Sequence, residues 1–219
     1  MKFHAVQPQP SQTALQVVFV DDALVVVDKP AGLPSVPGRA EGLQDCMASR
    51  VLSVAADALV VHRLDMATSG LLVFARGKAV QRSLSHAFAQ REVDKRYEAI
   101  VCGHVTHDVG EIDLPLITDW PNRPRQKVDF EAGKPSVTRY RVLARGDDET
   151  RLELEPLTGR SHQLRVHLLA LGHPILGDAL YGSAEVAGRA GRLLLHAKAL
   201  RFLHPVSGGA MQFESAVPF

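Results

Sequence analysis

The sequence predicts an α+β fold built on a mixed, largely antiparallel β-sheet flanked by helices and loops. Segments typical of strands outnumber segments typical of helices, several of the strands follow one another as hairpins, and no internal repeat or clear linker divides the chain. With 219 residues, 46% of them hydrophobic, the chain is long enough to bury a sizeable core. We therefore expect one domain at residues 16–219, preceded by a flexible polar arm at residues 1–15.

Apolar runs bounded by turn residues predict the strands. The runs 58–61 and 71–75 are continuously apolar, which is typical of buried strands. In residues 95–103, Tyr97, Ala99 and Val101 alternate and so share one face of a strand. The full set, in order, is two strands within residues 16–32 around an Asp21-Asp22 turn, then 58–61, 71–75, 95–103, a hairpin of 137–145 and 151–157, and finally 193–205 and 211–219.

Three segments have the apolar spacing of helices. The last of them, residues 159–174, has Ser161 as its expected N-cap and ends at Gly172, ahead of Pro174. The apolar stripes of the other two are Leu43, Met47, Val51 and Val54 in residues 43–55, and Val80, Leu84, Ala87 and Phe88 in residues 78–93. Loops rich in proline are expected at residues 33–42 and 119–135.

The amino-acid composition narrows the class of protein but does not indicate an activity. No apolar run is long enough to span a membrane and the N-terminus lacks the apolar stretch of a signal peptide, so we expect a cytoplasmic protein. Cys46 and Cys102 are far apart and are expected to be reduced core thiols. The net charge of +1 does not by itself indicate a nucleic-acid binder, although a local basic patch would be sufficient for one.

Residues 62–70, with the sequence HRLDMATSG, lie between two apolar runs. Thr68, Ser69 and Gly70 are turn formers, and they explain the end of the motif. A turn does not explain Arg63 and Asp65, because charge at the end of a buried strand is costly unless it is paired or used. An aspartate can act as a nucleophile, and a nearby arginine would keep it ionised.

Two further polar clusters are not required by a core: Lys95-Arg96-Tyr97, and Arg160-Ser161-His162 with Arg165. Taken alone, each has a structural interpretation, namely a core tyrosine with its hydroxyl bonded and a solvated basic helix start. His162 and His167 are five residues apart and would point in different directions on a helix, which argues against zinc. The glycine-rich motifs of dinucleotide and nucleoside triphosphate sites are absent. A serine-hydrolase interpretation of Ser161 lacks the final glycine of the nucleophile elbow.

The motifs in combination resemble those of the RluA family of RNA pseudouridine synthases. HRLDMATSG, KRY, GRSHQLRVH, HPILGDALYG and LLLHA occur in this order and at the family's spacings, and the likeness runs from about Val17 to the C-terminus. The family often has threonine and isoleucine where this chain has Ser161 and Leu164, which leaves the charged positions intact. Many relatives carry an N-terminal S4-type RNA-binding domain, and we expect none in this chain. The resemblance implies the pseudouridine synthase fold and an isomerase that converts uridine to pseudouridine.

The resemblance also implies roles for single residues. Asp65 matches the aspartate that attacks, or otherwise assists breakage of, the uridine C1′–N1 bond. Tyr97 matches the tyrosine that stacks on the base and helps to remove the C5 proton, and Arg165 matches the arginine that pairs with the aspartate. Arg63 matches the arginine that fills the space left by the flipped nucleotide, and Leu195 matches an apolar residue that packs against the base.

Further RNA contacts are expected from Arg160 and His162, and from Arg123, Arg125 and Lys127 in the proline-broken loop, which would bind phosphates. No metal or cofactor is implied. The stretch DWPNRPRQKV is most like the branch of the family that acts on stem-loops of 23S ribosomal RNA and on the tRNA anticodon loop, and we expect a monomeric enzyme of that specificity. A ribosomal-RNA-only enzyme and a non-catalytic RNA-binding relative remain the alternatives.

Overall fold

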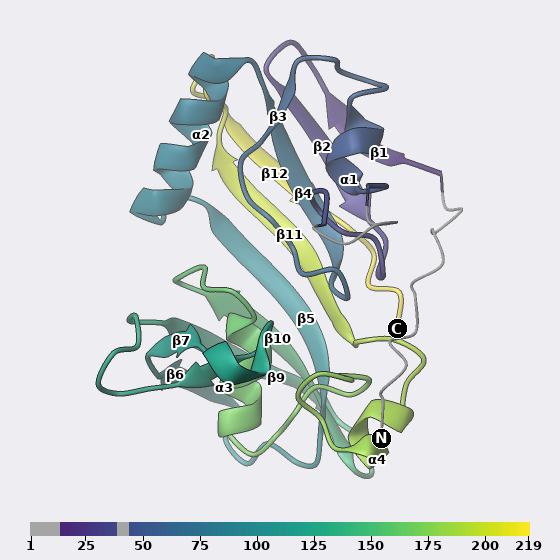
Figure 1. The fold of residues 1–219 in the computed structure, drawn as a ribbon, viewed down its shortest axis with the longest axis vertical. Helices are drawn as coiled ribbons and strands as arrows, with labels where there is room; N and C mark the ends of the chain where they lie inside the picture. The colour runs from purple at the N-terminus through teal and green to yellow at the C-terminus, as the bar shows by residue number, and fades with distance from the viewer. Residues whose placement is uncertain (1–13, 39–43) are drawn as a thin grey trace.

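The computed structural model describes residues 14–38 and 44–219 (Figure 1). The strands are β1 (Gln16–Val20), β2 (Leu24–Lys29), β3 (Ala58–Val60), β4 (Ser69–Arg76), β5 (Asp94–Cys102), β6 (Val109–Asp113), β7 (Leu116–Thr118), β8 (Gln126–Val128), β9 (Val137–Arg145), β10 (Glu149–Pro156), β11 (Leu195–Leu203) and β12 (Ala210–Glu214). The helices are α1 (Met47–Val51), α2 (Lys78–Gln90), α3 (Gln163–Ala170) and α4 (Ala184–Gly188), with one 3₁₀ turn, η1 (Trp120–Asn122).

Ten strands of this described part form one sheet, in the order β1-β2-β4-β11-β5-β10-β9-β6, with β3 paired to β4 and β12 to β11. The β4–β11 pair is parallel, and the other pairs of this sheet are antiparallel. Strands β7 and β8 form a separate hairpin. The predicted α+β class with a mixed, largely antiparallel sheet is therefore confirmed.

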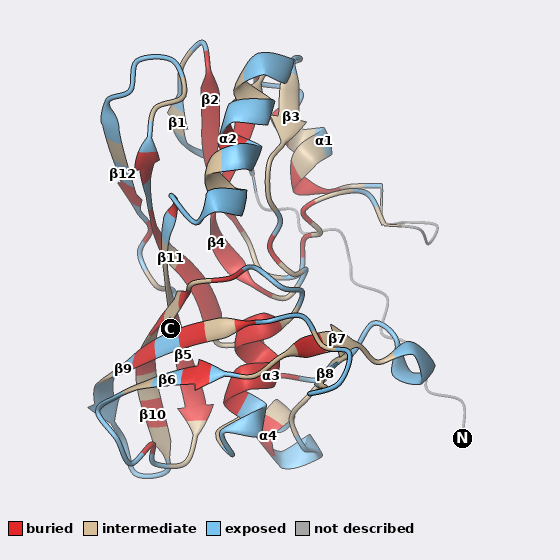
Figure 2. Ribbon diagram, turned by 90° about the vertical axis from the view of Figure 1, so that its left-hand side faces the viewer, coloured by how far each residue is buried: buried red, intermediate tan, exposed pale blue. Residues whose placement is uncertain are grey.

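The strands β2 and β4 are buried on both faces, which explains their continuous apolar sequences (Figure 2). On one face, Leu24 and Val26 pack in a cluster with Leu84 of α2. On the other face, Val25 and Val27 pack in a second cluster with Met47 and Val51 of α1. Helices on opposite sides thus hold these central strands in place, and the loop between β3 and β4 rests on this rigid base.

The half of the sheet formed by β5, β10 and β9 is covered on one side by α3. Leu152 and Leu154 of β10 pack there in a cluster with Leu164 and Leu168 of α3. The opposite side is charged and open to solvent, and Arg141 on β9 pairs with Glu153 on β10 at 2.9 Å. This alternation along β10 is the pattern of a strand with one buried face, and it fixes which side of the sheet α3 occupies.

The first two helices are shorter than the sequence predicts. Helix α1 begins after Cys46, whose Sγ accepts a hydrogen bond from the Ser49 backbone N–H, and it ends at Val51. Val54 is 46% exposed, so its predicted place on the buried stripe is wrong, and Leu43 lies outside the described residues. Helix α2 ends at Gln90 because Arg91 adopts a left-handed conformation with φ of 64°.

The predicted N-cap of α3 is also wrong. Ser161 is exposed, and α3 begins after His162, which has φ of 54° and makes no side-chain capping bond. The Gln163 amide oxygen instead accepts hydrogen bonds from the Arg160 backbone N–H at 3.0 Å and from the Thr158 hydroxyl at 2.7 Å. A side chain inside the helix therefore ties down the entering loop, which a search for N-cap residues does not detect.

Several elements were not predicted. Strand β6 and helix α4 have no counterpart in the prediction, and residues 119–135 contain η1 and β8 where a loop was expected. Of the predicted arm, residues 1–13 lie outside the described residues, whereas Leu15 packs against the cluster that contains α1. Cys46 and Cys102 are both free, and only Cys46 is fully buried. None of the helices in the described ranges is long and apolar enough to cross a membrane.

Gly70, at the start of β4, has no room for a side chain. Its φ is +110°, and a Cβ there would lie 2.3 Å from the Ala197 carbonyl oxygen of β11. Gly32 also has a positive φ, of +86°, but has no heavy atom within 4 Å of a Cβ position. We predict that Gly32→Ala lowers the free energy of unfolding by the backbone strain alone, roughly 1–2 kcal/mol, and that Gly70→Ala lowers it by well over twice that amount.

Chemical denaturation of the two variants measures this difference. The strain from φ is common to both substitutions, so the excess destabilisation in Gly70→Ala reports the close approach of β4 and β11. Equal destabilisation of the two variants would contradict that approach.

Candidate active site

The loop of residues 61–68 joins β3 to β4 and carries Asp65 at its centre. The Ser35 hydroxyl donates to the Leu64 carbonyl at 2.7 Å and accepts from the Leu64 N–H at 3.0 Å. The buried Lys29 Nζ donates to the Met66 carbonyl at 3.1 Å and to two carbonyls near its own strand. The residues on both sides of Asp65 are therefore held through their backbones, and the Asp65 side chain starts from a fixed position.

His62 anchors the start of this loop. Its Nε2 accepts a hydrogen bond from the Val73 backbone N–H at 3.2 Å, and its ring stacks on Phe88 of α2 with the ring centroids 4.5 Å apart. Burial lowers the pKa of His62 to about 3, with a smaller effect of Lys95 in the same direction. The first histidine of the HRLD sequence is thus a neutral structural residue.

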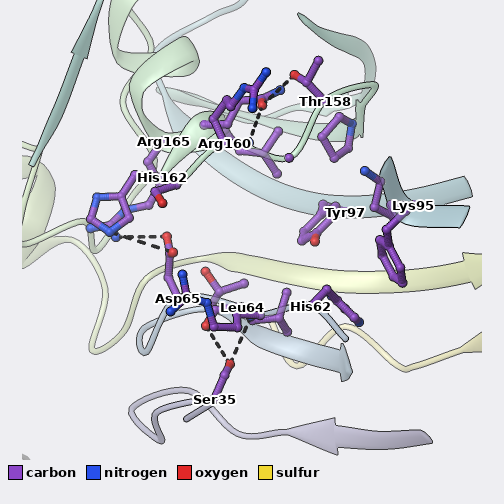
Figure 3. A pocket seen from close by; sticks show the side chains of 18 of the residues that line it. Ser35, His62, Leu64, Asp65, Lys95, Tyr97, Thr158, Arg160, His162 and Arg165 are labelled. Atoms are coloured by element: carbon purple, nitrogen blue, oxygen red, sulfur yellow. Dashed lines mark hydrogen bonds and ion pairs between the residues drawn. The ribbon is translucent and has the colours of Figure 1, made fainter. Parts of the chain in front are cut away.

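Arg165 lies next to Asp65 on the wall of the cavity (Figure 3). Its Nη1 lies 3.4 Å from Asp65 Oδ2, while its Nε and Nη2 donate to the two carboxylate oxygens of Asp178 at 2.8 and 2.7 Å. The side chains of Arg165 and Asp178 are only 7% and 1% exposed, whereas that of Asp65 is 25% exposed. Asp178 thus fixes the plane of the guanidinium, which presents its remaining edge to Asp65.

Among Asp65, Arg165 and Asp178, the buried pair of Arg165 and Asp178 is held in its ionised form. Burial lowers the pKa of Arg165, but the hydrogen bonds and charge of Asp178, together with the charge of Asp65, outweigh it and raise that pKa. Burial raises the pKa of Asp178, but the hydrogen bonds and charge of Arg165 and two backbone N–H groups bring it below the usual range. One buried cation is therefore shared between two carboxylates, of which only Asp65 borders the cavity.

Asp178 is a residue that sequence reasoning missed. It lies in the quoted HPILGDALYG motif, where an aspartate follows an apolar pair and a glycine. Its carboxylate also accepts from the N–H groups of Leu180 and Tyr181 at 3.0 and 3.1 Å, as a turn aspartate would. The presence of a charged residue in an otherwise apolar stretch could have indicated that Asp178 is important. Its partner, Arg165, lies 13 residues earlier in the chain, and only the fold shows that the two pair.

His162 and Tyr181 form the wall beside Asp65. His162 Nε2 lies 3.8 Å from Asp65 Oδ1, and His162 Nδ1 lies 2.7 Å from the Tyr181 hydroxyl, which accepts from the Gln126 backbone N–H of β8 at 2.8 Å. Burial lowers the pKa of His162, against the opposing charge of Asp65, so the ring is neutral at neutral pH. The hairpin β7–β8 is thereby linked to the catalytic carboxylate candidate through two side chains.

A cavity of about 710 Å³ lies between the Asp65 loop and the start of α3. It is lined by the predicted residues Asp65, Tyr97, Arg165, Arg63, Arg160, His162 and Leu195. The predicted residues Arg123, Arg125 and Lys127 do not line it, because they lie on or next to the hairpin β7–β8. In the part of the chain that the structure describes, no group of three or more His, Cys, Asp or Glu side chains could hold a metal ion.

Tyr97 of β5 presents its ring to this cavity (Figure 3). Burial raises its pKa above the usual value, and the negative charge of Asp65 adds to the effect. The phenol therefore keeps its proton at neutral pH in the free protein. Its hydroxyl has no hydrogen-bond partner among the described residues, so it remains available to a bound ligand. This favours stacking and hydrogen bonding by Tyr97 over action as a pre-ionised base.

The mouth of the cavity is basic. Arg63 is exposed and has no ion-pair or hydrogen-bond partner within residues 14–38 and 44–219, so a structural salt bridge does not account for it. Arg160 is exposed, and among the described residues its guanidinium donates only to the Pro135 carbonyl, at 3.3 Å. The cavity thus offers one carboxylate inside, a stacking ring and cationic side chains at its entrance, which suits a flipped base attached to a phosphate backbone.

A buried chain of hydrogen bonds supports the site from behind. Ser69 at the start of β4 contacts His196 Nδ1 of β11 at 2.7 Å, and His196 Nε2 contacts the Ser215 hydroxyl at 2.9 Å. The Ser215 hydroxyl donates to the Asp28 carboxylate, and Arg192 donates to the Ser69 hydroxyl. The chain crosses β4 and β11 where they run parallel.

The donors and acceptors in this chain of hydrogen bonds can be assigned because it begins at the Arg192 guanidinium and ends at the Asp28 carboxylate. The Ser215 hydrogen goes to the Asp28 carboxylate, so His196 Nε2 must donate to Ser215. Burial lowers the pKa of His196, so its neutral Nδ1 accepts from Ser69. Ser69 follows Asp65 by four residues, and His196 follows Leu195. The hydrogen-bond chain therefore holds the loop that carries Asp65 against Leu195, and both border the same cavity.

Comparison with known proteins identifies the relatives of this chain. The family model described as RNA pseudouridylate synthase matches residues 23–170. The dual-specificity RNA pseudouridine synthase RluA of Escherichia coli (strain K12) is 51% identical over 211 residues, which cover 96% of each chain. The RluA protein of Haemophilus influenzae is 49% identical over the same shares of both chains. The solved structure of human RNA pseudouridylate synthase domain containing 1 has a TM-score of 0.78 and 31% identity, and the match covers 94% of this chain and 84% of that one.

We predict that Asp178→Asn abolishes most pseudouridine formation, although Asp178 does not line the cavity. The amide cannot neutralise the buried Arg165, so the guanidinium loses its fixed plane and the protein loses roughly 3–5 kcal/mol of stability. Thermal melting and initial rates, measured below the melting points of all variants, report the two effects separately.

Glu98→Gln provides the matched control. Glu98 is a buried carboxylate that pairs with Arg151 and Lys198, outside the cavity. It should cost stability but little activity. A wild-type rate in folded Asp178→Asn would contradict the role assigned to the pair.

We also predict a difference between two substitutions of His196. Asparagine places its amide near the Nδ1 position and can still accept from Ser69, whereas glutamine reaches the Nε2 position and keeps only the Ser215 contact. His196→Gln should therefore lower the rate of pseudouridine formation roughly 10- to 100-fold, because it displaces the loop that carries Asp65, and His196→Asn should lower it much less. If both variants lose activity in proportion to their loss of melting temperature, His196 has only a structural role.

Proposed function

The chain belongs to the RNA pseudouridylate synthase family, and from this membership we propose that it isomerises uridines in stem-loops of 23S ribosomal RNA and in the tRNA anticodon loop, with Asp65 as the catalytic carboxylate. That it is an RNA pseudouridine synthase follows from the family model and the close relatives. The proposal of two RNA classes is supported by the relatives named dual-specificity synthases, which match almost the whole chain. The observation that carries the assignment of Asp65 is that its carboxylate borders the cavity, 3.4 Å from the guanidinium of the buried Arg165.

The reaction needs no other reactant, because every atom of uridine is retained. Asp65 attacks C1′ or otherwise assists loss of the base, and the electron pair of the C1′–N1 bond leaves with the uracil. The uracil turns, C5 bonds to C1′, and the proton on C5 is transferred while N1 gains one. Arg165 supplies the counter-charge that a carboxylate needs in a partly dry cavity.

Tyr97 and Leu195 are proposed to hold the uracil while it is detached. Both line the cavity, and the Tyr97 ring offers a stacking surface. Since burial and the charge of Asp65 raise the pKa of Tyr97, its phenol can accept the C5 proton only if it first gives up its own. We therefore assign Tyr97 to stacking first, and to proton transfer only once the uracil is bound.

Arg63, Arg160 and His162 are proposed to hold the RNA at the mouth of the cavity. A uridine in a stem-loop must leave its stack before C1′ is accessible, and Arg63 is free to occupy the space that it vacates. Arg160 is proposed to bind a phosphate, and His162 the sugar or phosphate beside Asp65, because both line the cavity and His162 lies 3.8 Å from Asp65. Asp65, Tyr97 and Arg165 line one cavity within a single chain, so we propose a monomeric enzyme. We also propose that it meets its RNA in the cytoplasm.

Pseudouridine mapping in total RNA from cells with and without this protein tests the proposal. We expect specific pseudouridines to disappear from both 23S ribosomal RNA and tRNA when the protein is absent. Loss from ribosomal RNA alone would support the narrower alternative. Unchanged maps in both, with no activity of the purified protein on either RNA, would favour a non-catalytic RNA-binding relative and overturn the proposal.

We predict that the exposed cations Arg123, Arg125 and Lys127 bind RNA phosphates. Replacing all three with glutamine should weaken binding of stem-loop RNA and reduce the slope of log K against log salt by roughly 0.7–0.9 for each phosphate that is no longer neutralised. A control triple variant replaces Arg139, Arg141 and Arg201, which line a groove on the charged face of the sheet. Filter binding between about 50 and 200 mM salt measures both slopes. Equal slopes in the two triple variants would rule out this role for the hairpin.

A further inference from the structure

We propose that Trp120 is a stacking platform for an unpaired RNA base other than the target uridine. This inference rests on the proposed function and adds a second base-binding site to it. Trp120 lies in η1, between β7 and β8, and is 65% exposed. It does not line the cavity that contains Asp65, so a base that stacks on it cannot be the uridine under attack. A single exposed aromatic residue is ordinary on its own, and the proposal depends on what surrounds it.

Arg123 occupies one side of the indole. Its guanidinium carbon lies 4.4 Å from the ring centroid, in the geometry of a cation–π contact. Because the residue is still 65% exposed with one face covered, the opposite face of the ring is open. An open aromatic face backed by an arginine is the combination that binds single-stranded bases, in which the ring stacks and the cation meets the phosphate.

The tip of the hairpin is held together by its own hydrogen bonds. The Asp119 N–H donates to the Arg125 carbonyl at 2.9 Å, and the Asn122 and Arg125 N–H groups donate to the Asp119 and Asn122 carbonyls at 3.0 Å. The Asn122 side chain also donates to the Asp119 carboxylate at 2.9 Å. A preformed platform loses little conformational entropy when a base stacks on it.

The platform is also connected to the reaction centre. The Gln126 N–H, next to the tip, donates to the Tyr181 hydroxyl at 2.8 Å, and that hydroxyl contacts His162 Nδ1 at 2.7 Å. His162 in turn faces Asp65. Trp120 is therefore held at a set position relative to the carboxylate, so one RNA loop can place its uridine in the cavity and a second base on the indole.

The charge around Trp120 favours RNA as the occupant. Arg123, Arg125, Lys127 and Lys134 are all exposed on this segment, and of these Lys127 has an ion-pair partner, Asp129 at 3.1 Å. The segment also exposes the ring of Phe130, which is 78% exposed, and rings interspersed with cations fit unpaired bases on a phosphate backbone, whereas a protein partner would prefer a larger continuous apolar patch. The occupant is thus an unstacked base of the same stem-loop that supplies the target uridine.

Intrinsic fluorescence tests this directly, because the chain contains one tryptophan. We titrate the full-length protein with a stem-loop RNA substrate and follow tryptophan emission, with filter binding as an independent measure of the dissociation constant. Stacking should quench the emission, and the quench should saturate at the RNA concentration at which binding saturates. Replacing the unpaired loop nucleotides with abasic sites, one at a time, should abolish the quench at one position while that RNA still binds.

Substitutions supply the second arm. Trp120→Ala should weaken binding of the intact stem-loop roughly 5- to 150-fold, the range for loss of one stacked base, and lower kcat/KM by a similar factor. It should cause little further loss with the RNA that is abasic at the critical position. Trp120→Phe should recover most of the affinity. Val206→Ala is the control, because Val206 is 72% exposed at the turn between β11 and β12 and should not affect binding.

The outcomes distinguish failure of the stacking platform from failure of the proposed function. If the RNA binds and is modified but leaves the emission unchanged, and Trp120→Ala binds like the wild type, the platform is wrong while the proposed function stands. If the intact protein neither binds nor modifies the stem-loop, the proposed function fails and the platform fails with it. Quenching by every abasic RNA alike would also overturn the inference, because it would show a general change of environment and no specific stacking.

Discussion

The buried guanidinium of Arg165 is the constraint on which the site depends. An almost fully buried cation requires a fixed counter-charge, and Asp178 provides it with two hydrogen bonds of 2.7 and 2.8 Å. This pairing joins helix α3 to the segment that follows it, and it leaves one edge of the guanidinium for Asp65. The Asp65 carboxylate can therefore remain partly exposed to the cavity, because its counter-charge, Arg165, is held by a buried residue that does not line the cavity.

The sheet brings the other half of the site to this pair. Strand β4 runs parallel to β11 at only one place, where Ser69 and Gly70 lie beside His196 and Ala197. The absence of a side chain at Gly70 permits the close approach, and the hydrogen-bond chain through His196 fixes its register. The Asp65 loop and Leu195 then border one cavity from neighbouring strands. Backbone packing and a buried polar chain thus set the distance across the site.

Much of this organisation was predictable from local sequence, and the failures have physical causes. The apolar runs of β2 and β4 and the stripe around Leu84 follow from periodicity, because these elements bury whole faces. The site residues Asp65, Tyr97 and Arg165 were singled out from polar clusters and a family resemblance. The start of α3 was missed because His162 adopts a left-handed conformation that no residue preference indicates. Asp178 was missed because its partner is defined by tertiary structure, and the hairpin β7–β8 because prolines mask its short strands.

We propose that the Asp65 carboxylate, held beside Arg165, carries out the chemistry. Tritium release from RNA labelled at uracil C5 measures this most directly, with Asp65→Asn as the variant because asparagine keeps the shape and removes the charge. We expect that this variant folds with a melting temperature close to that of the wild type, binds the stem-loop and releases no tritium. If Asp65 only caps a turn, asparagine would serve about as well. Tritium release by purified Asp65→Asn at a rate near that of the wild type would contradict the account.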